Sequence, residues 1–179
     1  MLIRMKKTRG GVVLTCIRDQ GSVAVQRNGH GGFFALHDLM HYAVESVLGL
    51  NRAFFGLVSE GWDFETFSDK EDPRYQSLPE EAIFAEHLVA CLTRRYSERA
   101  WEDTELLALF TDEVNREVSG ALRPFAATPS KIAQIYTLFG NLAARWTAVP
   151  IGEHMELTFP PAGSPNTDLN GGREPGAIG

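Results

Sequence analysis

The spacing of apolar residues changes within residues 23–49, which read VAVQRNGHGGFFALHDLMHYAVESVLG. The first residues of this stretch alternate, as in a strand that buries one face. Three glycines follow within residues 28–32, and they permit backbone angles that other residues avoid. From Phe33 the apolar residues recur at helical spacing until Gly49. The stretch therefore predicts a strand, a glycine-rich turn and an amphipathic helix in succession.

Further strand patterns lie on both sides of this stretch. Residues 2–7 alternate apolar and basic side chains, and residues 12–17 form a β-branched run. Together with residues 23–27, the second run predicts an antiparallel hairpin around the glycine-containing turn at 19–22. Residues 152–159 alternate once more, which predicts a late strand that rejoins the early sheet.

Four more helices are predicted after the first one. A short helix has Asn51 as its N-cap and ends at Gly61, whereas a longer one opens with a capping-box pattern at Ser77. The polar segment 62–76 separates them and is predicted to be a loop that forms a lid or rim. The four helices are predicted over residues 51–60, 77–96, 104–122 and 128–146.

This order of elements defines the expected fold class. A sheet built from both ends of the chain, with helices between, is an α+β pattern. We expect a small antiparallel sheet, made of the N-terminal hairpin and the late strand, with about five helices. Residues 1–159 are expected to form a single domain, followed by a flexible tail at 160–179 that is rich in proline and glycine.

Composition and charge exclude several classes of protein. The 179 residues carry a net charge of −6 and the pI is about 5.4, which argues against nucleic acid or an anionic membrane as the main partner. No apolar run approaches the roughly 20 residues that span a bilayer, and no secretory signal is recognisable. Cys16 and Cys91 are expected to be reduced core thiols. A soluble cytoplasmic protein is the expected result.

The helix predicted from Phe33 carries the most informative side chains, His37-Asp38-Leu39-Met40-His41. Residues four apart lie one turn apart on the same helix face, about 5–6 Å apart at Cβ. His37 and His41 can therefore direct imidazole nitrogens at one metal ion. Glu45 lies on the same arc but eight residues from His37, about 12 Å along the helix axis, so it is expected to support the site rather than bind the ion.

These residues resemble the zincin motif His-Glu-x-x-His, with Asp38 in place of the glutamate. The resemblance implies that His37 and His41 bind zinc and that Asp38 activates the water on the metal. In the gluzincin branch a glutamate on the following helix is the third ligand, and Glu60 occupies the matching position. Glu86 and His87, on the next predicted helix, are the rivals for that role.

Three functions follow from these patterns. The first is a zinc-binding, zincin-like domain that hydrolyses peptide bonds, with weak or lost activity because Asp is shorter than Glu. The second is a non-catalytic binding or regulatory module whose metal site is structural or absent. The third arises because His37 and Asp38 also resemble the doublet of HD-domain phosphohydrolases. That family needs an upstream histidine in an all-helical fold, and here only His30 precedes the doublet.

Overall fold

Four antiparallel strands form the sheet in the computed structural model, which describes residues 1–29, 33–96, 104–118 and 127–160. The strands lie in the order β3-β2-β1-β4, so the last strand pairs with the first. The late strand and the hairpin predicted from the sequence are both confirmed. The bounds are β1 Leu2–Lys7, β2 Val12–Ile17, β3 Val23–Asn28 and β4 His154–Thr158.

Cross-strand register places the apolar residues of the sheet on one face. Ile3 of β1 lies opposite Cys16 of β2 and Leu157 of β4, and Cys16 lies opposite Ala24 of β3. All four side chains are buried, because residues that alternate along each strand point to the same face. This face forms the floor of the hydrophobic core.

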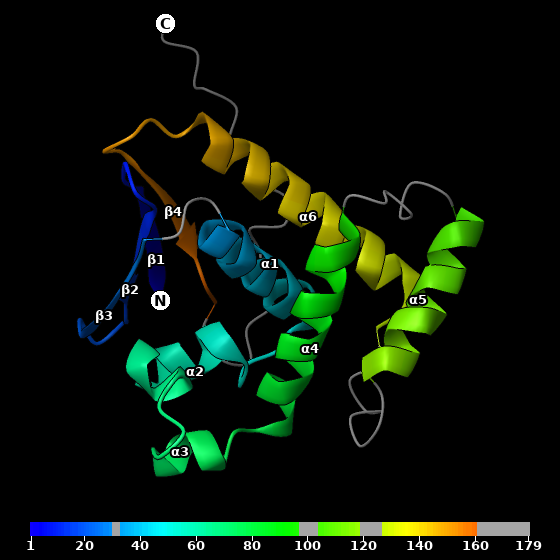
Figure 1. Cartoon of the computed structure of the whole chain (residues 1–179), viewed down its shortest axis with the longest axis horizontal. Helices are drawn as coiled ribbons and strands as arrows, with labels where there is room; N and C mark the ends of the chain where they lie inside the picture. Colours follow the sequence, from blue (N-terminus) through cyan, green and yellow to red (C-terminus); the bar gives the residue numbers. More distant parts are fainter. Residues whose placement is uncertain (30–32, 97–103, 119–126, 161–179) are drawn as a thin grey trace, which may run out of the picture.

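The helices lie on one side of the sheet (Figure 1). Helix α1 occupies the middle of this layer, with the sheet on one side and α4 and α6 packed against it. An α+β fold is therefore confirmed. The bounds are α1 Phe33–Leu48, α2 Phe54–Glu60, α3 Pro73–Gln76, α4 Glu80–Arg95, α5 Thr104–Val118 and α6 Pro129–Ala148, with a 3-10 turn, η1, at Phe64–Phe67.

Two segments differ from the sequence-based expectation or fall outside the described residues. The segment 62–76 was predicted to be a loop, but it contains η1 and the short helix α3. The glycine-rich turn around residue 31, the predicted helical residues 119–122 and almost all of the predicted tail 160–179 lie outside the described residues.

Helix starts show how tertiary contacts replace local capping. Asn51 is not the N-cap of α2, because the helix begins after Ala53. Near the start of α2, the backbone N–H of Phe55 donates a hydrogen bond to the Glu45 carboxylate instead. Ser77 does not cap α4 either, since its hydroxyl donates to the Pro73 carbonyl at 2.9 Å. Thr128 caps α6 through the Lys131 N–H, as its sequence pattern predicts.

Helix α1 is buried over most of its circumference. Its residues from Asp38 to Val47 are all buried, including the polar side chains Asp38, His41 and Glu45. A helix enclosed on all sides is usually hydrophobic all round. Buried titratable groups on such a helix require partners within the protein, because burial disfavours their charged forms.

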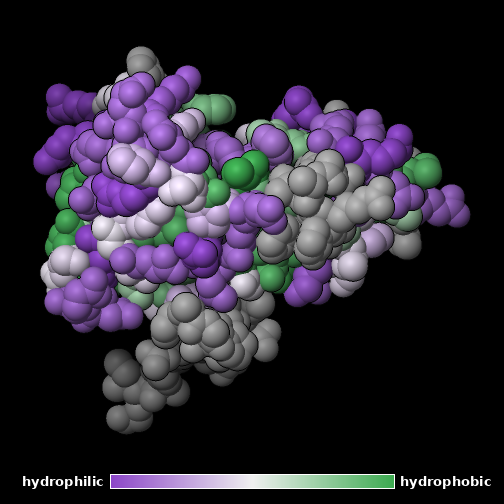
Figure 2. Space-filling view, turned by 90° about the horizontal axis from the view of Figure 1, so that it is seen from below, coloured by the Kyte–Doolittle hydropathy of each residue, from purple (hydrophilic) through white to green (hydrophobic). Residues whose placement is uncertain are grey.

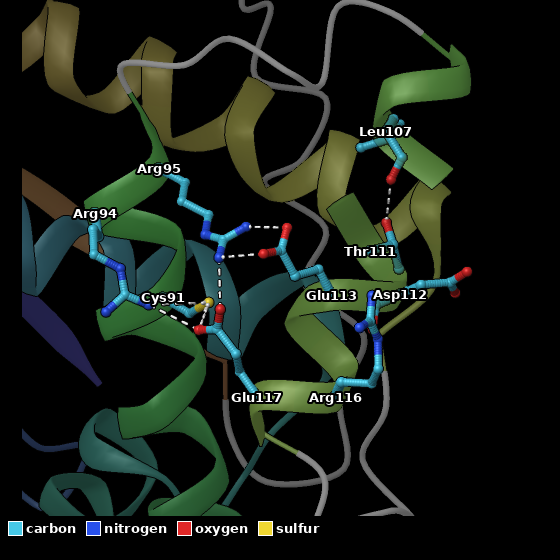
Figure 3. Close-up of polar contacts among 9 residues, drawn as sticks. All are labelled: Cys91, Arg94, Arg95, Leu107, Thr111, Asp112, Glu113, Arg116 and Glu117. Carbon is cyan, nitrogen blue, oxygen red and sulfur yellow. Dashed lines mark hydrogen bonds and ion pairs between the residues drawn. The ribbon is translucent and has the colours of Figure 1, made fainter. Parts of the chain in front are cut away.

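Ion pairs connect α4 with α5 at a distance from this helix (Figure 3). Arg95 contacts Glu113 at 2.6 Å and Glu117 at 2.6 Å, and Arg94 contacts Glu117 at 2.8 Å. The Cys91 thiol also donates to Glu117, at 3.1 Å. The carboxylates are substantially exposed, so each pair contributes little to stability, typically about 0–1 kcal/mol.

Polar side chains predominate on the face viewed in Figure 2, where apolar ones form only small separate patches. Both cysteines are buried and free, as expected. Burial and the nearby charge of Asp38 raise the pKa of the Cys16 thiol to about 12, so this thiol stays protonated. None of the helices in the described ranges has the length and apolar character needed to cross a membrane.

Candidate metal centre

Three potential metal ligands converge between α1 and α4. His37 and His41 lie one turn apart on α1, with their ring centroids 4.7 Å apart. Glu86 reaches them from α4, which packs beside α1. One ligand atom from each of the three residues lies within 4.8 Å of the other two. This spacing suits a single ion between them, because zinc binds such atoms at about 2.0–2.2 Å.

The two imidazole rings have the same orientation relative to the surrounding carboxylates. Nε2 of His41 lies 3.0 Å from Glu86 Oε2, and Nε2 of His37 lies 3.7 Å from Glu86 Oε1. On the opposite side of the rings, Nδ1 of His37 lies 3.8 Å from Asp38 Oδ1, and Nδ1 of His41 lies 3.4 Å from Glu45 Oε1. Metal-binding histidines commonly direct their second nitrogen at a carboxylate in this way. The Nε2 atoms are therefore the candidate ligand atoms.

Glu45 is held in place by the start of α2. Its Oε2 accepts hydrogen bonds from the backbone N–H groups of Phe55 at 2.9 Å and Gly56 at 3.2 Å. A Cβ atom on Gly56 would overlap the backbone carbonyl of Asn51, so a side chain cannot fit there without movement. Glycine thus allows the chain before α2 to pack closely enough for Glu45 to bond both N–H groups while facing His41.

The charges of the cluster strongly affect one another. Burial alone would lower the pKa of His41, but Glu45 and Glu86 outweigh it and raise that pKa to about 9. Contacts with His37 and then His41 hold the pKa of the Glu86 carboxyl well below its usual range. Burial raises the pKa of Asp38 despite the opposing effect of the histidines. The cluster therefore favours bound positive charge, which protons or a cation can supply.

Several buried polar atoms around the histidines form no well-aligned hydrogen bond with the described residues. They include Oδ2 of Asp38, Oε1 of Glu45 and both ring nitrogens of His41, although these nitrogens lie 3.4 and 3.0 Å from carboxylate oxygens of Glu45 and Glu86. Buried side-chain nitrogen and oxygen atoms are normally satisfied, so such a group indicates a missing ion or water. Their position around the three converging ligand atoms fits a bound metal ion.

A cavity of about 380 Å³ opens onto the cluster. Phe67 of η1 and Tyr75 of α3 lie in its wall, so the segment 62–76 forms part of its rim, as predicted. The lining residues are Gln26, Phe34, His37, Asp38, His41, Phe54, Phe67, Tyr75, Leu78, Ala82, Ile83, Glu86 and His87. The volume lies at the lower end of the range found for small-molecule pockets, roughly 300–1,000 Å³.

The structure brings Glu86 to the two histidines and leaves Glu60 outside the cluster. Glu60 ends α2 and lies 3.8 Å from Arg52, with its side chain well exposed. His87, the other rival on α4, is exposed and lines the cavity beside Glu86. His30, the upstream histidine that an HD-domain site would use, lies outside the described residues.

No family model, curated protein or solved structure matches the chain. The resemblance to zincins therefore rests on the residues of the chain itself.

Proposed function

We propose that the chain binds one divalent transition metal ion, preferably zinc, through Nε2 of His37, Nε2 of His41 and a carboxylate oxygen of Glu86. The observation that carries this proposal is the paired orientation of the two rings. Each Nε2 faces Glu86, and each Nδ1 faces a different buried carboxylate, Asp38 or Glu45. Such an arrangement fixes the ring orientation and makes Nε2 a better ligand.

The kind and number of ligands favour a catalytic type of site. Two histidines and one glutamate form a ligand set used by catalytic zinc, which keeps one coordination position for water or substrate. The cavity lined by His37, His41 and Glu86 gives that position access from outside. A structural zinc site would instead be closed by a fourth protein ligand. Among the described residues, the cluster that could hold an ion has three.

The proposed reaction is hydrolysis of an amide or ester bond. A metal ion bound here would supply Lewis-acid activation of a water molecule and of the substrate carbonyl. Oδ1 of Asp38 faces His37, whereas Oδ2 has no hydrogen-bond partner among the described residues. Oδ2 is therefore the atom to which we assign the proton released by the water. The water oxygen bonds to the acyl carbon, the bond from that carbon to the leaving nitrogen or oxygen breaks, and the leaving atom takes up the proton from Asp38.

The alternative function is a metal-binding module without hydrolysis. It is favoured by Asp38 Oδ1, which lies 3.8 Å from His37 Nδ1, as expected for a residue that orients the ring. A cytoplasmic location is part of either proposal, and the free buried thiols of Cys16 and Cys91 support a reducing compartment.

Zinc binding by matched glutamate variants tests the proposal. Wild-type protein is expected to hold about one zinc per chain by elemental analysis and to bind zinc in titration calorimetry after chelator treatment. Glu86→Gln should remove tight binding, because it replaces a ligand carboxylate. Glu60→Gln, the control, should bind zinc like the wild type. Circular dichroism establishes that both variants are folded. Absence of zinc binding in the wild type, or equal losses in the two variants, would refute the proposed ligand set.

A further inference from the structure

Most of the side chains that line the cavity beside the proposed metal ion are apolar. Its wall combines aromatic and aliphatic side chains from six elements or connecting segments: Phe34, Phe54, Phe67, Tyr75, Leu78, Ala82 and Ile83. Rings in this wall also pack on one another, with the centroids of Phe54 and Phe67 5.0 Å apart. A pre-formed wall of this kind favours an apolar group of side-chain size, because the volume is only about 380 Å³.

None of the described residues that line the cavity is Lys or Arg. Sites for phosphate or carboxylate groups usually provide arginine, lysine or a helix N-terminus. An anionic group placed away from the histidines and the proposed metal would therefore have no lysine or arginine to pair with.

Apolar surface continues outward from the cavity. Phe33 is 63% exposed and stacks beside His37, with ring centroids 6.2 Å apart and an interplanar angle of 28°. Ile83 lines the cavity and is 39% exposed. Large apolar side chains that remain exposed next to a pocket mark a surface that a ligand can cover. The substrate is therefore expected to extend beyond the cavity over these two side chains.

We propose that the site acts on amides or esters that carry an uncharged aromatic or bulky aliphatic group next to the reacting carbonyl. A phosphate or carboxylate on that group is disfavoured, because the described lining of the cavity offers it no lysine or arginine. This inference rests on the proposed function for the chemistry, but the selectivity of the cavity can be measured with or without metal.

The first experiment measures selectivity in zinc-loaded protein. Two metal-binding probes of equal charge are compared, 3-phenylpropanehydroxamic acid and acetohydroxamic acid. The phenyl probe should bind at least about tenfold more tightly, because its ring enters the apolar cavity. Ala82→Phe should reduce that ratio to below about threefold by filling the cavity. The control Ala90→Phe, on an exposed site of the same helix, should keep the ratio. Equal affinities for the two probes would overturn the inference while leaving the metal site intact.

The second experiment uses metal-free protein, so it decides the inference even where zinc fails to bind. Binding of 2-naphthylmethanol, a neutral apolar probe, is followed by ligand fluorescence at pH 7.5. The wild type is expected to bind the probe at least about tenfold more tightly than Ala82→Phe, whereas Ala90→Phe should keep the wild-type affinity. Absence of binding by the wild type, or binding that Ala82→Phe leaves unchanged, would overturn the proposed selectivity.

Discussion

Nδ1 of His41 lies 3.4 Å from Oε1 of Glu45, and both side chains are buried in the interior of the domain. The other oxygen of the same carboxylate accepts hydrogen bonds from the first N–H groups of α2. One side chain thus connects a proposed metal ligand with the start of the next helix. Substitution at this position should affect both metal affinity and stability, and the two effects can be separated.

We predict that Glu45→Gln lowers zinc affinity by about 10–100-fold, because the carboxylate no longer faces His41. The amide oxygen can still accept from the N–H groups of α2, so the fold should be retained. Glu45→Ala removes that acceptor as well. Its free energy of unfolding should therefore be about 1–3 kcal/mol lower than that of Glu45→Gln. Calorimetric titration and denaturant unfolding measure the two effects, with exposed Glu153→Gln as the control. A Glu45→Gln protein with wild-type zinc affinity would contradict the prediction.

Substitutions of Asp38 distinguish between the two proposed functions, a hydrolase and a metal-binding module without hydrolysis. If its Oδ2 accepts the proton of the water, Asp38→Asn should keep zinc and lower hydrolysis of a neutral peptide library by about 10²–10⁴-fold. Asp38→Glu should retain zinc and measurable cleavage. Mass spectrometry of the library and elemental analysis of each protein provide both readouts. Zinc in all three proteins with no cleavage by any of them would support the module without hydrolysis.

The sequence pattern was sufficient to predict α1, but it left the third proposed ligand open between Glu60, Glu86 and His87. Helix α1 begins at Phe33 and is followed by Gly49 with φ +71, as the apolar spacing and the glycine indicate. Glu86, by contrast, is 45 positions after His41, and only the packing of α4 on α1 brings the two together. A local pattern cannot show which later helix packs beside α1.

Hydrogen bonds from Arg18, which follows strand β2, account for the position of Glu60. Arg18, just after β2, donates from Nε to the Val58 carbonyl near the end of α2 at 2.6 Å. The same guanidinium donates to the Trp62 carbonyl at 2.6 Å. These bonds tie the end of α2 to the end of β2, while Glu60 itself lies beside Arg52. Sequence spacing alone favoured Glu60, because this long-range contact of Arg18 is not visible in the local pattern.

The stability of the metal-free protein should depend on pH through His41. Its folded-state pKa of about 9, which Glu45 and Glu86 raise against the effect of burial, exceeds the unfolded value of about 6.5. The stabilising contribution is therefore complete below about pH 6.5 and is lost as the pH rises through about 9. Zinc must displace this proton, so zinc affinity should rise over the same interval.

Urea unfolding of chelator-treated protein from pH 6 to 9.5 checks this prediction, together with calorimetry in buffers of different ionisation enthalpy. His41→Gln provides the control, since it should flatten the decline in unfolding free energy. If the unfolding free energy of the wild type rose between pH 6.5 and 9, the predicted direction of the pH dependence would be wrong.

Gly56 offers a test of the packing that holds Glu45. We predict that Gly56→Ala destabilises the fold by about 1–3 kcal/mol, because the new Cβ overlaps the Asn51 backbone. Gly140→Ala in α6 is the matched control, since its Cβ would meet only the Tyr96 hydroxyl at 3.5 Å, an ordinary contact. Alanine is favoured over glycine inside helices, so this control should be neutral or stabilising by up to about 1 kcal/mol. Thermal unfolding compares the two, and equal effects would refute the packing argument.

The strand order β3-β2-β1-β4 has a consequence for how the chain acquires its structure during synthesis. The first three strands can form from neighbouring hairpins early, but β1 stays an open edge until residues 154–158 have left the ribosome. Contacts between residues so far apart in the chain slow folding, because a long loop must close first. An exposed strand edge is also a site for association between nascent chains. Chains truncated before β4 should therefore aggregate, even though they keep His37, His41 and Glu86.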